Sequence, residues 1–203
     1  MFMIKYPNGM KKQTSDASPV LTRYGGRGAS LEDDLNRSNE YYRECDIALI
    51  YKKPTPIQVV RVDYPNRAHA KIIEAYYRTP STTDYNGIYQ GKAIDFEAKE
   101  TINKTMFPFK YIHAHQIEHL RKVIKHGGIA FLIIRFSAHA QTYLVPAEEI
   151  LSRYDAKQKS ISYRDVCSCG QLIREGFTPR LHYLDAVDAI YFKEEIHHDE
   201  KVK

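Results

Sequence analysis

Ile94-Asp-Phe-Glu-Ala-Lys-Glu-Thr101 alternates apolar and polar residues near the middle of the chain. The apolar positions are Ile94, Phe96 and Ala98, and the polar positions are Asp95, Glu97 and Lys99. A period of two is typical of a β-strand that buries its apolar face and keeps a polar face on the other side. Residues 82–89 are also extended in character, and a turn that contains Gly91 joins them to this strand. We therefore expect a β-hairpin over residues 82–100.

Further helices and strands are expected on both sides of this hairpin. Residues 31–44 have a helical spacing of apolar side chains behind an N-cap candidate, Ser30. A second helical pattern spans about 113–125 and stops at Gly127-Gly128, and the continuous apolar run 129–136 predicts a buried strand. The weaker predictions are a strand at 47–51, a strand at 142–145, a helix from 146 to about 154, a polar segment at 160–167 and a short apolar helix or strand at 184–192. This order predicts an α/β fold with a central mixed β-sheet flanked by helices.

A basic segment precedes the hairpin. Residues 57–78 read as an extended ribbon followed by a short mixed segment. Between 52 and 78 the basic residues are Lys52, Lys53, Arg61, Arg67, Lys71 and Arg78, the acids are Asp63 and Glu74, and the tyrosines are Tyr64, Tyr76 and Tyr77. Cations beside exposed aromatic rings are suited to phosphates and unstacked bases. The alternative is an ordinary half-buried strand and loop with a solvated face.

The 203 residues, 43% hydrophobic and 27% charged, suit one domain, with or without an appendage. Lys and Arg exceed Asp and Glu by 30 to 25, a net charge of +5 that permits an anionic partner without requiring one. This excess is concentrated in residues 1–30 and 52–78, so the remainder is acidic on balance. We expect a flexible basic arm at 1–28, a main domain at 29–192 with an insertion at about 54–80, and a disordered tail at 193–203.

Three cysteines are too few for a disulfide framework and indicate a reducing compartment, for which the cytoplasm is the expected location. The longest apolar run is far shorter than the roughly 20 residues of a membrane helix. The first residues are polar and do not resemble a signal peptide. Neither a secreted nor a membrane-spanning protein is therefore expected.

Glu97-Ala98-Lys99 carries the sharpest chemical pattern. Residues at i and i+2 of a strand point the same way, with roughly 6–7 Å between their Cα atoms, so a carboxylate and an ammonium group lie side by side. The antiparallel return of the hairpin can bring Asp84 next to Glu97. Two carboxylates suit Mg²⁺, which would polarise a phosphate and lower the pKa of an attacking water, while Lys99 offsets the charge of the transition state. An acid cluster that also included Asp95 would repel itself without a cation; the alternative is a surface Glu–Lys pair.

Several longer motifs resemble the RecU Holliday junction resolvases of Gram-positive bacteria over residues 25–192. They are Arg27-Gly-Ala-Ser-Leu-Glu-Asp-Asp-Leu, Lys52-Lys-Pro-Thr-Pro-Ile-Gln, Val62-Asp-Tyr-Pro, Ser81-Thr-Thr-Asp-Tyr-Asn-Gly, Ile94-Asp-Phe-Glu-Ala-Lys-Glu-Thr and His115-Gln-Ile-Glu-His. The resemblance implies a restriction-endonuclease-like nuclease core, a homodimer, dependence on Mg²⁺ with Mn²⁺ as a substitute, and a stalk that enters the centre of a four-way DNA junction. It further suggests contacts with the recombinase RecA and the branch-migration helicase RuvB, while the short apolar runs already predict no membrane association.

The same resemblance assigns roles to individual residues. It implies that the metal ligands are Thr82, Asp84, Glu97 and Gln116, and that the catalytic residues are Asp84, Glu97 and Lys99. It links Arg27 and Arg67 to DNA handling. Together with the basic segment, it predicts a DNA-binding set of Arg27, Lys52, Lys53, Arg61, Arg67, Lys71 and Tyr77. A two-fold dimer with two metal sites would match a two-fold junction that is resolved by paired symmetric nicks.

Two other functions fit parts of the sequence. His115-Gln-Ile-Glu118-His119 is formally an H-x-x-E-H motif, with two imidazoles one helical turn apart and a glutamate as possible general base of a zinc protease. No third zinc ligand is identifiable from spacing. A non-catalytic junction-binding protein on a nuclease fold is the second alternative, and the intact Asp84, Glu97 and Lys99 disfavour it.

Overall fold

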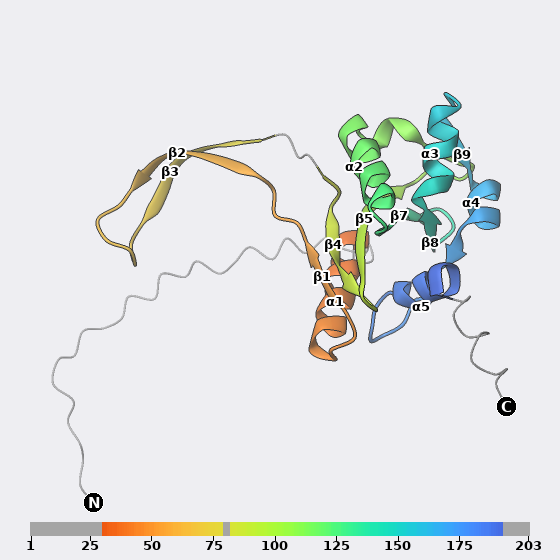
Figure 1. Cartoon of the computed structure of the whole chain (residues 1–203), viewed down its shortest axis with the longest axis horizontal. Coiled ribbons are helices and arrows are strands. Elements are labelled where there is room, and N and C mark those ends of the chain that lie inside the picture. The colour runs from red at the N-terminus through yellow and green to blue at the C-terminus, as the bar shows by residue number, and fades with distance from the viewer. Residues whose placement is uncertain (1–29, 79–81, 193–203) are drawn as a thin grey trace, which may run out of the picture.

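A six-stranded mixed sheet forms the centre of the computed structural model, which describes residues 30–78 and 82–192 (Figure 1). Its strands are ordered β1-β4-β5-β7-β8-β10, and only the central pair β5 and β7 is parallel. The strands of this sheet are β1 (Leu49–Lys52), β4 (Tyr85–Tyr89), β5 (Lys92–Thr101), β7 (Ile129–Phe136), β8 (Gln141–Pro146) and β10 (Gln171–Leu172). The α/β fold with a central mixed sheet, expected from the sequence, is confirmed.

Helices cover both faces of the sheet. One face carries α1 (Leu31–Glu44), α5 (Tyr183–Val187) and the π-helical turn η2 (Asp188–Phe192), and the other carries the 3-10 turn η1 (Phe109–Tyr111), α2 (Ala114–Lys125), α3 (Ala147–Asp155) and α4 (Tyr163–Cys169). The strands β6 (Met106–Pro108) and β9 (Ser160–Ser162) pair beside this second layer. Because β7 is buried along its whole length, its alternate side chains supply both cores.

Aromatic stacking holds the carboxylate-bearing strand in place. On the α1 face, the Phe96 ring stacks between the rings of Tyr85 and Phe131, with centroids 4.9 and 4.8 Å away. Burial of such a side chain stabilises the fold by about 1.5–3 kcal/mol. With Phe96 directed into one core, its neighbours Asp95 and Glu97 are directed to the α2 face.

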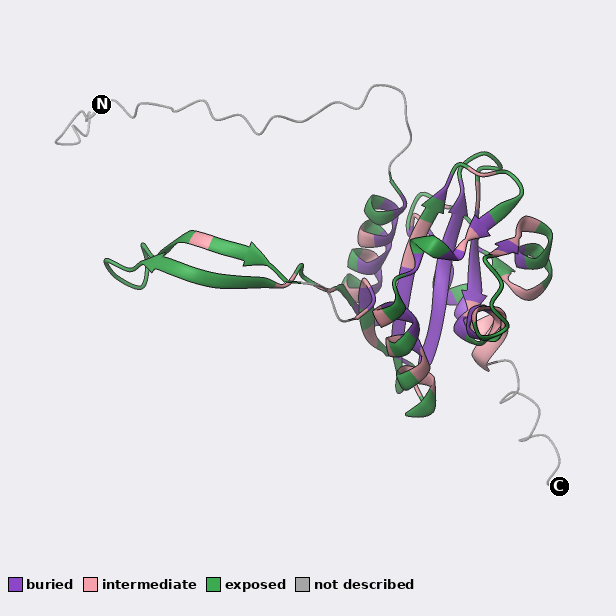
Figure 2. Ribbon diagram, turned by 90° about the horizontal axis from the view of Figure 1, so that it is seen from above, coloured by how far each residue is buried: buried purple, intermediate pink, exposed green. Residues whose placement is uncertain are grey.

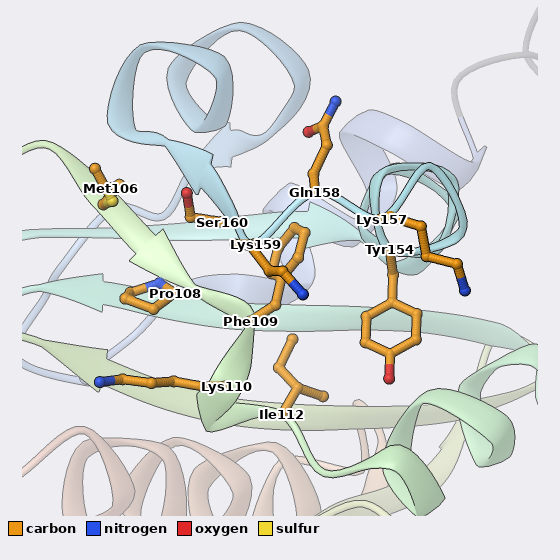
Figure 3. Close-up of a pocket in the computed structure, with 10 residues that line it drawn as sticks. All are labelled: Met106, Pro108, Phe109, Lys110, Ile112, Tyr154, Lys157, Gln158, Lys159 and Ser160. Atoms are coloured by element: carbon orange, nitrogen blue, oxygen red, sulfur yellow. The ribbon is translucent and has the colours of Figure 1, made fainter.

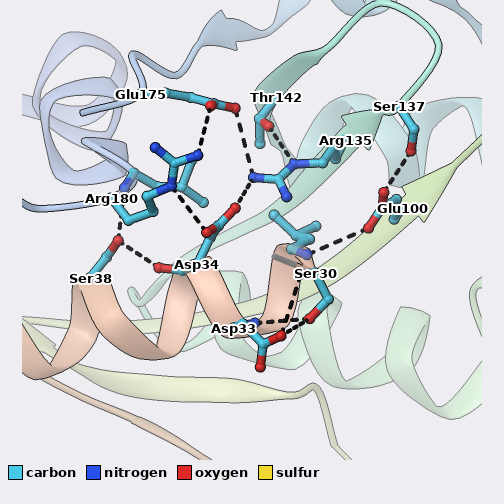
Figure 4. Close-up of polar contacts among 12 residues, drawn as sticks. Ser30, Asp33, Asp34, Ser38, Glu100, Arg135, Ser137, Thr142, Glu175 and Arg180 are labelled. Atoms are coloured by element: carbon cyan, nitrogen blue, oxygen red, sulfur yellow. Dashed lines mark hydrogen bonds and ion pairs between the residues drawn. The ribbon is translucent and has the colours of Figure 1, made fainter. Parts of the chain in front are cut away.

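An ion-pair network around the buried Asp34 fastens α1 to β7 and to the segment that precedes α5 (Figure 4). Asp34, only 2% exposed, accepts hydrogen bonds from Arg135 Nη2 at 2.7 Å and Arg180 Nε at 3.2 Å. Glu175 approaches both guanidinium groups, at 3.8 and 3.6 Å. Loss of one partner of such a buried pair is costly because the other charge stays desolvated. The network therefore holds the first turn of α1 against the sheet, where the helix also contacts β5.

The basic segment forms a two-stranded ribbon that projects from the sheet (Figures 1 and 2). The strands β2 (Ile57–Asp63) and β3 (Lys71–Tyr77) pair antiparallel from Ile57 opposite Tyr77 to Asp63 opposite Lys71. All of their residues are exposed except the half-buried Glu74. The expectation of a short mixed segment after the first strand is wrong, because residues 71–77 pair along the whole of β2 and thereby become a strand.

Most predicted elements are confirmed, and the differences are local. The helix at 31–44 and the strand at 129–136 have the expected bounds. The first strand begins at Leu49 instead of 47, since the N–H groups of residues 47 and 48 are bonded to Tyr42 O. Residues 160–167 contain β9 and most of α4, and residues 184–192 are helical. Among the described residues, no helix is long and apolar enough to cross a membrane. The predicted arm at 1–28 and tail at 193–203 lie outside the described residues.

Candidate active site

Glu97 is the centre of the candidate site. Its side chain is fully buried on β5, and the backbone N–H of Asp84, one residue before β4, donates to Glu97 Oε2 at 3.1 Å. Lys99 Nζ lies 2.6 Å from Glu97 Oε1. The hairpin and the i, i+2 spacing thus place Asp84, Glu97 and Lys99 together, although Asp84 precedes the strand in which it was expected.

Gln116 joins this group from the first turn of α2. Its Nε2 donates to Glu97 Oε1 at 2.6 Å, and its Oε1 accepts from the backbone N–H of His113 at 2.9 Å. These two bonds define which end of the amide faces the carboxylate. Thr82 is half-buried two residues before Asp84, and its hydroxyl donates to the Thr83 carbonyl at 3.4 Å.

The pKa of Glu97 is raised to about 7, first by burial and then by the nearby Asp84 carboxylate, while Lys99 opposes the rise. Lys99 supplies one positive charge for two carboxylates, so the pair is not neutralised by the protein alone. The carboxylate oxygens of Asp84 and Glu97 are ligands of hard divalent cations, whereas the Gln116 amide presents its nitrogen to Glu97 and its oxygen to the His113 N–H. The residues present therefore fit a divalent metal held by Asp84 and Glu97, with Thr82 and Gln116 next to it.

Asp95 belongs to a separate charged cluster on the same face of β5. Lys53 Nζ lies 2.8 Å from Asp95 Oδ2, His119 Nε2 lies 3.1 Å from the same oxygen, and the Thr83 hydroxyl donates to Oδ1. Lys53 also donates its backbone N–H to Asp84 O at 2.7 Å. The charge of Asp95 is therefore balanced by Lys53. The predicted repulsion among three acids is left only between Asp84 and Glu97. No sequence spacing pointed to this contact, because 42 positions separate Lys53 from Asp95.

The predicted DNA-binding residues occupy two environments. Lys52 is ion-paired with Glu32, and Lys53 is held at the base of the ribbon by Asp95. The ribbon and its turn expose Arg61, Arg67, Lys71 and Tyr77. Arg27 lies outside the described residues. The exposed set can meet a polyanion without breaking any ion pair that holds the core.

The H-x-x-E-H motif lies on α2, but its parts point to different neighbours. His119 contacts Asp95, while Glu118 is largely exposed and lies 3.7 Å from Arg121. The His115 ring stacks on that of His113, with centroids 5.4 Å apart, and its Nε2 has no hydrogen-bond partner among the described residues. Over the same residues, no three His, Cys, Asp or Glu side chains converge as a metal site. This geometry does not support the zinc protease alternative.

The carboxylates of Asp84 and Glu97 lie together with Lys99 at the β4–β5 hairpin of the mixed sheet, and the Gln116 amide completes a group suited to a metal-dependent nuclease. The model of the family described as Recombination protein U matches residues 26–189. The chain belongs to this RecU family.

Curated relatives support the same membership. The Holliday junction resolvase RecU of Geobacillus thermodenitrificans is 50% identical over 197 residues, covering 93% of this chain and 98% of that protein. The protein of the same name from Bacillus cytotoxicus is 48% identical over 198 residues, with 93% and 98% coverage. Among solved structures, the Holliday junction resolvase Hjc of Archaeoglobus fulgidus aligns with 13% identity and a TM-score of 0.40, covering 70% of this chain and 92% of that one.

Proposed function

We propose that this protein is a magnesium-dependent endodeoxyribonuclease that resolves Holliday junctions by paired symmetric nicks. Membership in a family whose curated relatives are named Holliday junction resolvases supports the substrate and the reaction class. The buried Glu97, joined to Asp84, Lys99 and Gln116 within one site, is the observation that carries the proposal.

The residues of the site divide the work of phosphodiester hydrolysis. Mg²⁺, or Mn²⁺ in its place, held by Asp84 and Glu97 would polarise the scissile phosphate and lower the pKa of the attacking water. Lys99 is half-buried next to Glu97, so its ammonium group can offset the charge that develops on the phosphate oxygens. Gln116 keeps the Glu97 carboxylate in one orientation through its two hydrogen bonds.

The ribbon supplies the means to recognise a junction. It carries exposed cations and aromatic rings away from the sheet, and its base is bonded to the strand that bears Glu97. Contacts with phosphates and with unstacked bases recognise shape instead of sequence. We assign Arg61, Arg67, Lys71 and Tyr77 to this recognition.

A homodimer would supply the second nick. On the face of β1 and β4 opposite α1, Leu49 lies across from Ile88, and the exposed fractions are 51% for Leu49 and 57% for Ile88. A two-fold copy packed on this apolar face would present two sites to a two-fold junction. The family also suggests RecA and RuvB as partners, and the three free cysteines are consistent with a cytoplasmic location.

Cleavage of a labelled synthetic four-way junction in Mg²⁺ tests the proposal, with linear duplex and single strand of the same sequences as comparison substrates. We expect paired nicks in opposing strands of the junction alone. Asp84→Asn and Glu97→Gln should bind the junction in metal-free buffer and fail to nick it. Binding without any nicking by the wild-type protein would support the non-catalytic alternative instead.

A further inference from the structure

A second basic surface lies on the α2 and α3 face, separate from the ribbon. A groove of about 720 Å³ runs between the β6–η1 segment and the connection from α3 to β9 (Figure 3). Lys110, Lys159 and Lys157 lie along it, and Figure 3 shows their ammonium groups at one side, near the middle and at the other side of the view. The groove therefore presents a row of positive charges, not a single one.

Two of these lysines have only weak partners in the described part of the chain: Lys110 Nζ lies 5.3 Å from the centroid of the Tyr111 ring, and Lys157 acts on the Asp155 carboxylate from beyond salt-bridge distance. None of them is within ion-pair distance of an acid among the described residues, and none of the residues that line the groove is acidic. The neighbouring Asp155 is engaged by Arg121, with both carboxylate oxygens bonded at 2.9 and 3.1 Å. Three cations without a salt bridge on one surface are suited to an anionic ligand.

The groove is connected to the active site through the start of α2. Ile112 lines the groove, and the next residue, His113, donates its backbone N–H to Gln116, which in turn donates to Glu97. The ribbon leaves the sheet at β1 and β4, whereas α3 packs on β7 and β8. The strand β5, which carries Glu97, thus lies between the ribbon and α3 (Figure 1).

We propose that this groove binds the sugar–phosphate backbone of the duplex arm that leaves the active site on the side away from the ribbon. The inference rests on the proposed function. Lysine ammonium groups act as point charges toward phosphate oxygens whatever the base sequence. The apolar floor, formed by Phe109, Ile112 and Tyr154, suits the deoxyribose faces between phosphates. The ribbon then contacts the centre of the junction, and the groove determines the direction of one arm.

The test compares two triple variants with the same loss of charge. Lys110→Gln/Lys157→Gln/Lys159→Gln removes the groove cations. The control, Lys92→Gln/Lys122→Gln/Lys125→Gln, removes three exposed lysines that lie away from the groove. Lys92 is at the start of β5, and Lys122 and Lys125 are in the last turn of α2. Junction affinity is measured in Ca²⁺ buffer at several salt concentrations, after circular dichroism and thermal melting confirm that both variants are folded. We expect the groove variant to bind at least about tenfold more weakly at 0.1 M salt, with the slope of log Kd against log salt lowered by about 3.

Neutral methylphosphonate linkages in one arm then locate the contact. At phosphates next to the scissile position, these linkages should weaken junction binding by the wild-type protein. They should leave junction binding by the groove variant unchanged, since its cations are already absent. Equal losses in the two triple variants, or equal effects of the linkages on wild type and groove variant, would overturn the inference. The readout here is junction binding in Ca²⁺ buffer, which does not require cleavage. Absence of nicking by the wild type in Mg²⁺ would therefore contradict the proposed function without deciding the role of the groove.

Discussion

Lys53 Nζ lies 2.8 Å from Asp95 Oδ2, and this contact joins the base of the projecting ribbon to the strand that carries Glu97. The same lysine donates its backbone N–H to Asp84 O, and Thr83, next to Asp84, donates its hydroxyl to Asp95. Both connections of the ribbon to the sheet therefore meet at one largely buried ion pair, two residues from Glu97.

Asp95→Asn should destabilise the fold by about 2–3 kcal/mol, because the largely buried Lys53 ammonium loses its counter-ion. Chemical denaturation in metal-free buffer measures this change. The control is Glu32→Gln, which removes the partner of the more exposed Lys52 and should cost less than about 1 kcal/mol. Equal costs for the two substitutions would mean that burial of the Lys53 pair has no energetic consequence.

Gln116→Leu should raise the Mg²⁺ concentration for half-maximal nicking by roughly 10–100-fold, since the Glu97 carboxylate loses the amide that orients it. Titration of Mg²⁺ at saturating junction measures the shift. Gln171→Leu, at an exposed position on β10, is the matched control and should leave the titration unchanged. A normal Mg²⁺ requirement in Gln116→Leu would remove Gln116 from the site.

Lys99→Met should lower the nicking rate at saturating junction and Mg²⁺ by roughly 10²–10³-fold, because charge on the transferring phosphate is no longer offset. Junction affinity should change little, since one half-buried lysine contributes a small part of a large phosphate interface. Single-turnover cleavage and a separate binding assay in Ca²⁺ distinguish the two effects. Lys99→Arg, which retains the charge, should recover part of the rate; loss of affinity with an unchanged rate would contradict the assignment.

The raised pKa of Glu97 predicts how stability depends on pH. A carboxyl group with a folded-state pKa of about 7 instead of 4.5 holds its proton more tightly in the folded state. Its contribution is complete below pH 4.5 and is lost as the pH rises through 7, by up to about 3 kcal/mol. In EDTA, wild type should therefore lose stability over this range relative to Glu97→Gln, which has no proton to release. Parallel pH profiles of the two proteins would contradict the shift.

Added Mg²⁺ should oppose this loss, because metal and proton compete for the same carboxylate. Thermal melting at pH 8 with and without Mg²⁺ measures the effect. The stabilisation should shrink toward pH 5 and be absent in Glu97→Gln. Stabilisation of equal size at pH 5 and pH 8 would place the metal elsewhere.

Arg67→Ala and Tyr77→Ala should weaken junction binding without changing the melting temperature, since both side chains are exposed on the ribbon. Loss of Arg67 should lower the slope of log Kd against log salt by about 1, and loss of the Tyr77 ring should cost about 1–3 kcal/mol at any salt concentration. Measurement of Kd over a salt series tells the two contributions apart. An unchanged Kd for both variants would exclude the ribbon from DNA recognition.

Local pattern was sufficient for the elements that build the site. The capped helix at Leu31–Glu44, the hairpin of β4 and β5 and the apolar β7 depend on neighbours in the chain, so periodicity and turn residues reveal them. The side-by-side placement of Glu97 and Lys99 also follows from strand geometry alone. Residue 116, by contrast, was named only through the resemblance to relatives.

Tertiary structure decided the contacts between segments that lie far apart in the chain. The contacts of Gln116 with Glu97 and of Lys53 with Asp95 join residues 19 and 42 positions apart, and no local periodicity encodes such distances. The pKa of Glu97 likewise depends on burial beneath α2, which forms only when the helix packs on the sheet. The chain by itself determined the chemical groups and the strands that carry them, because those depend on local geometry. Their partners, and the charge balance that favours a metal, depend on packing between distant segments.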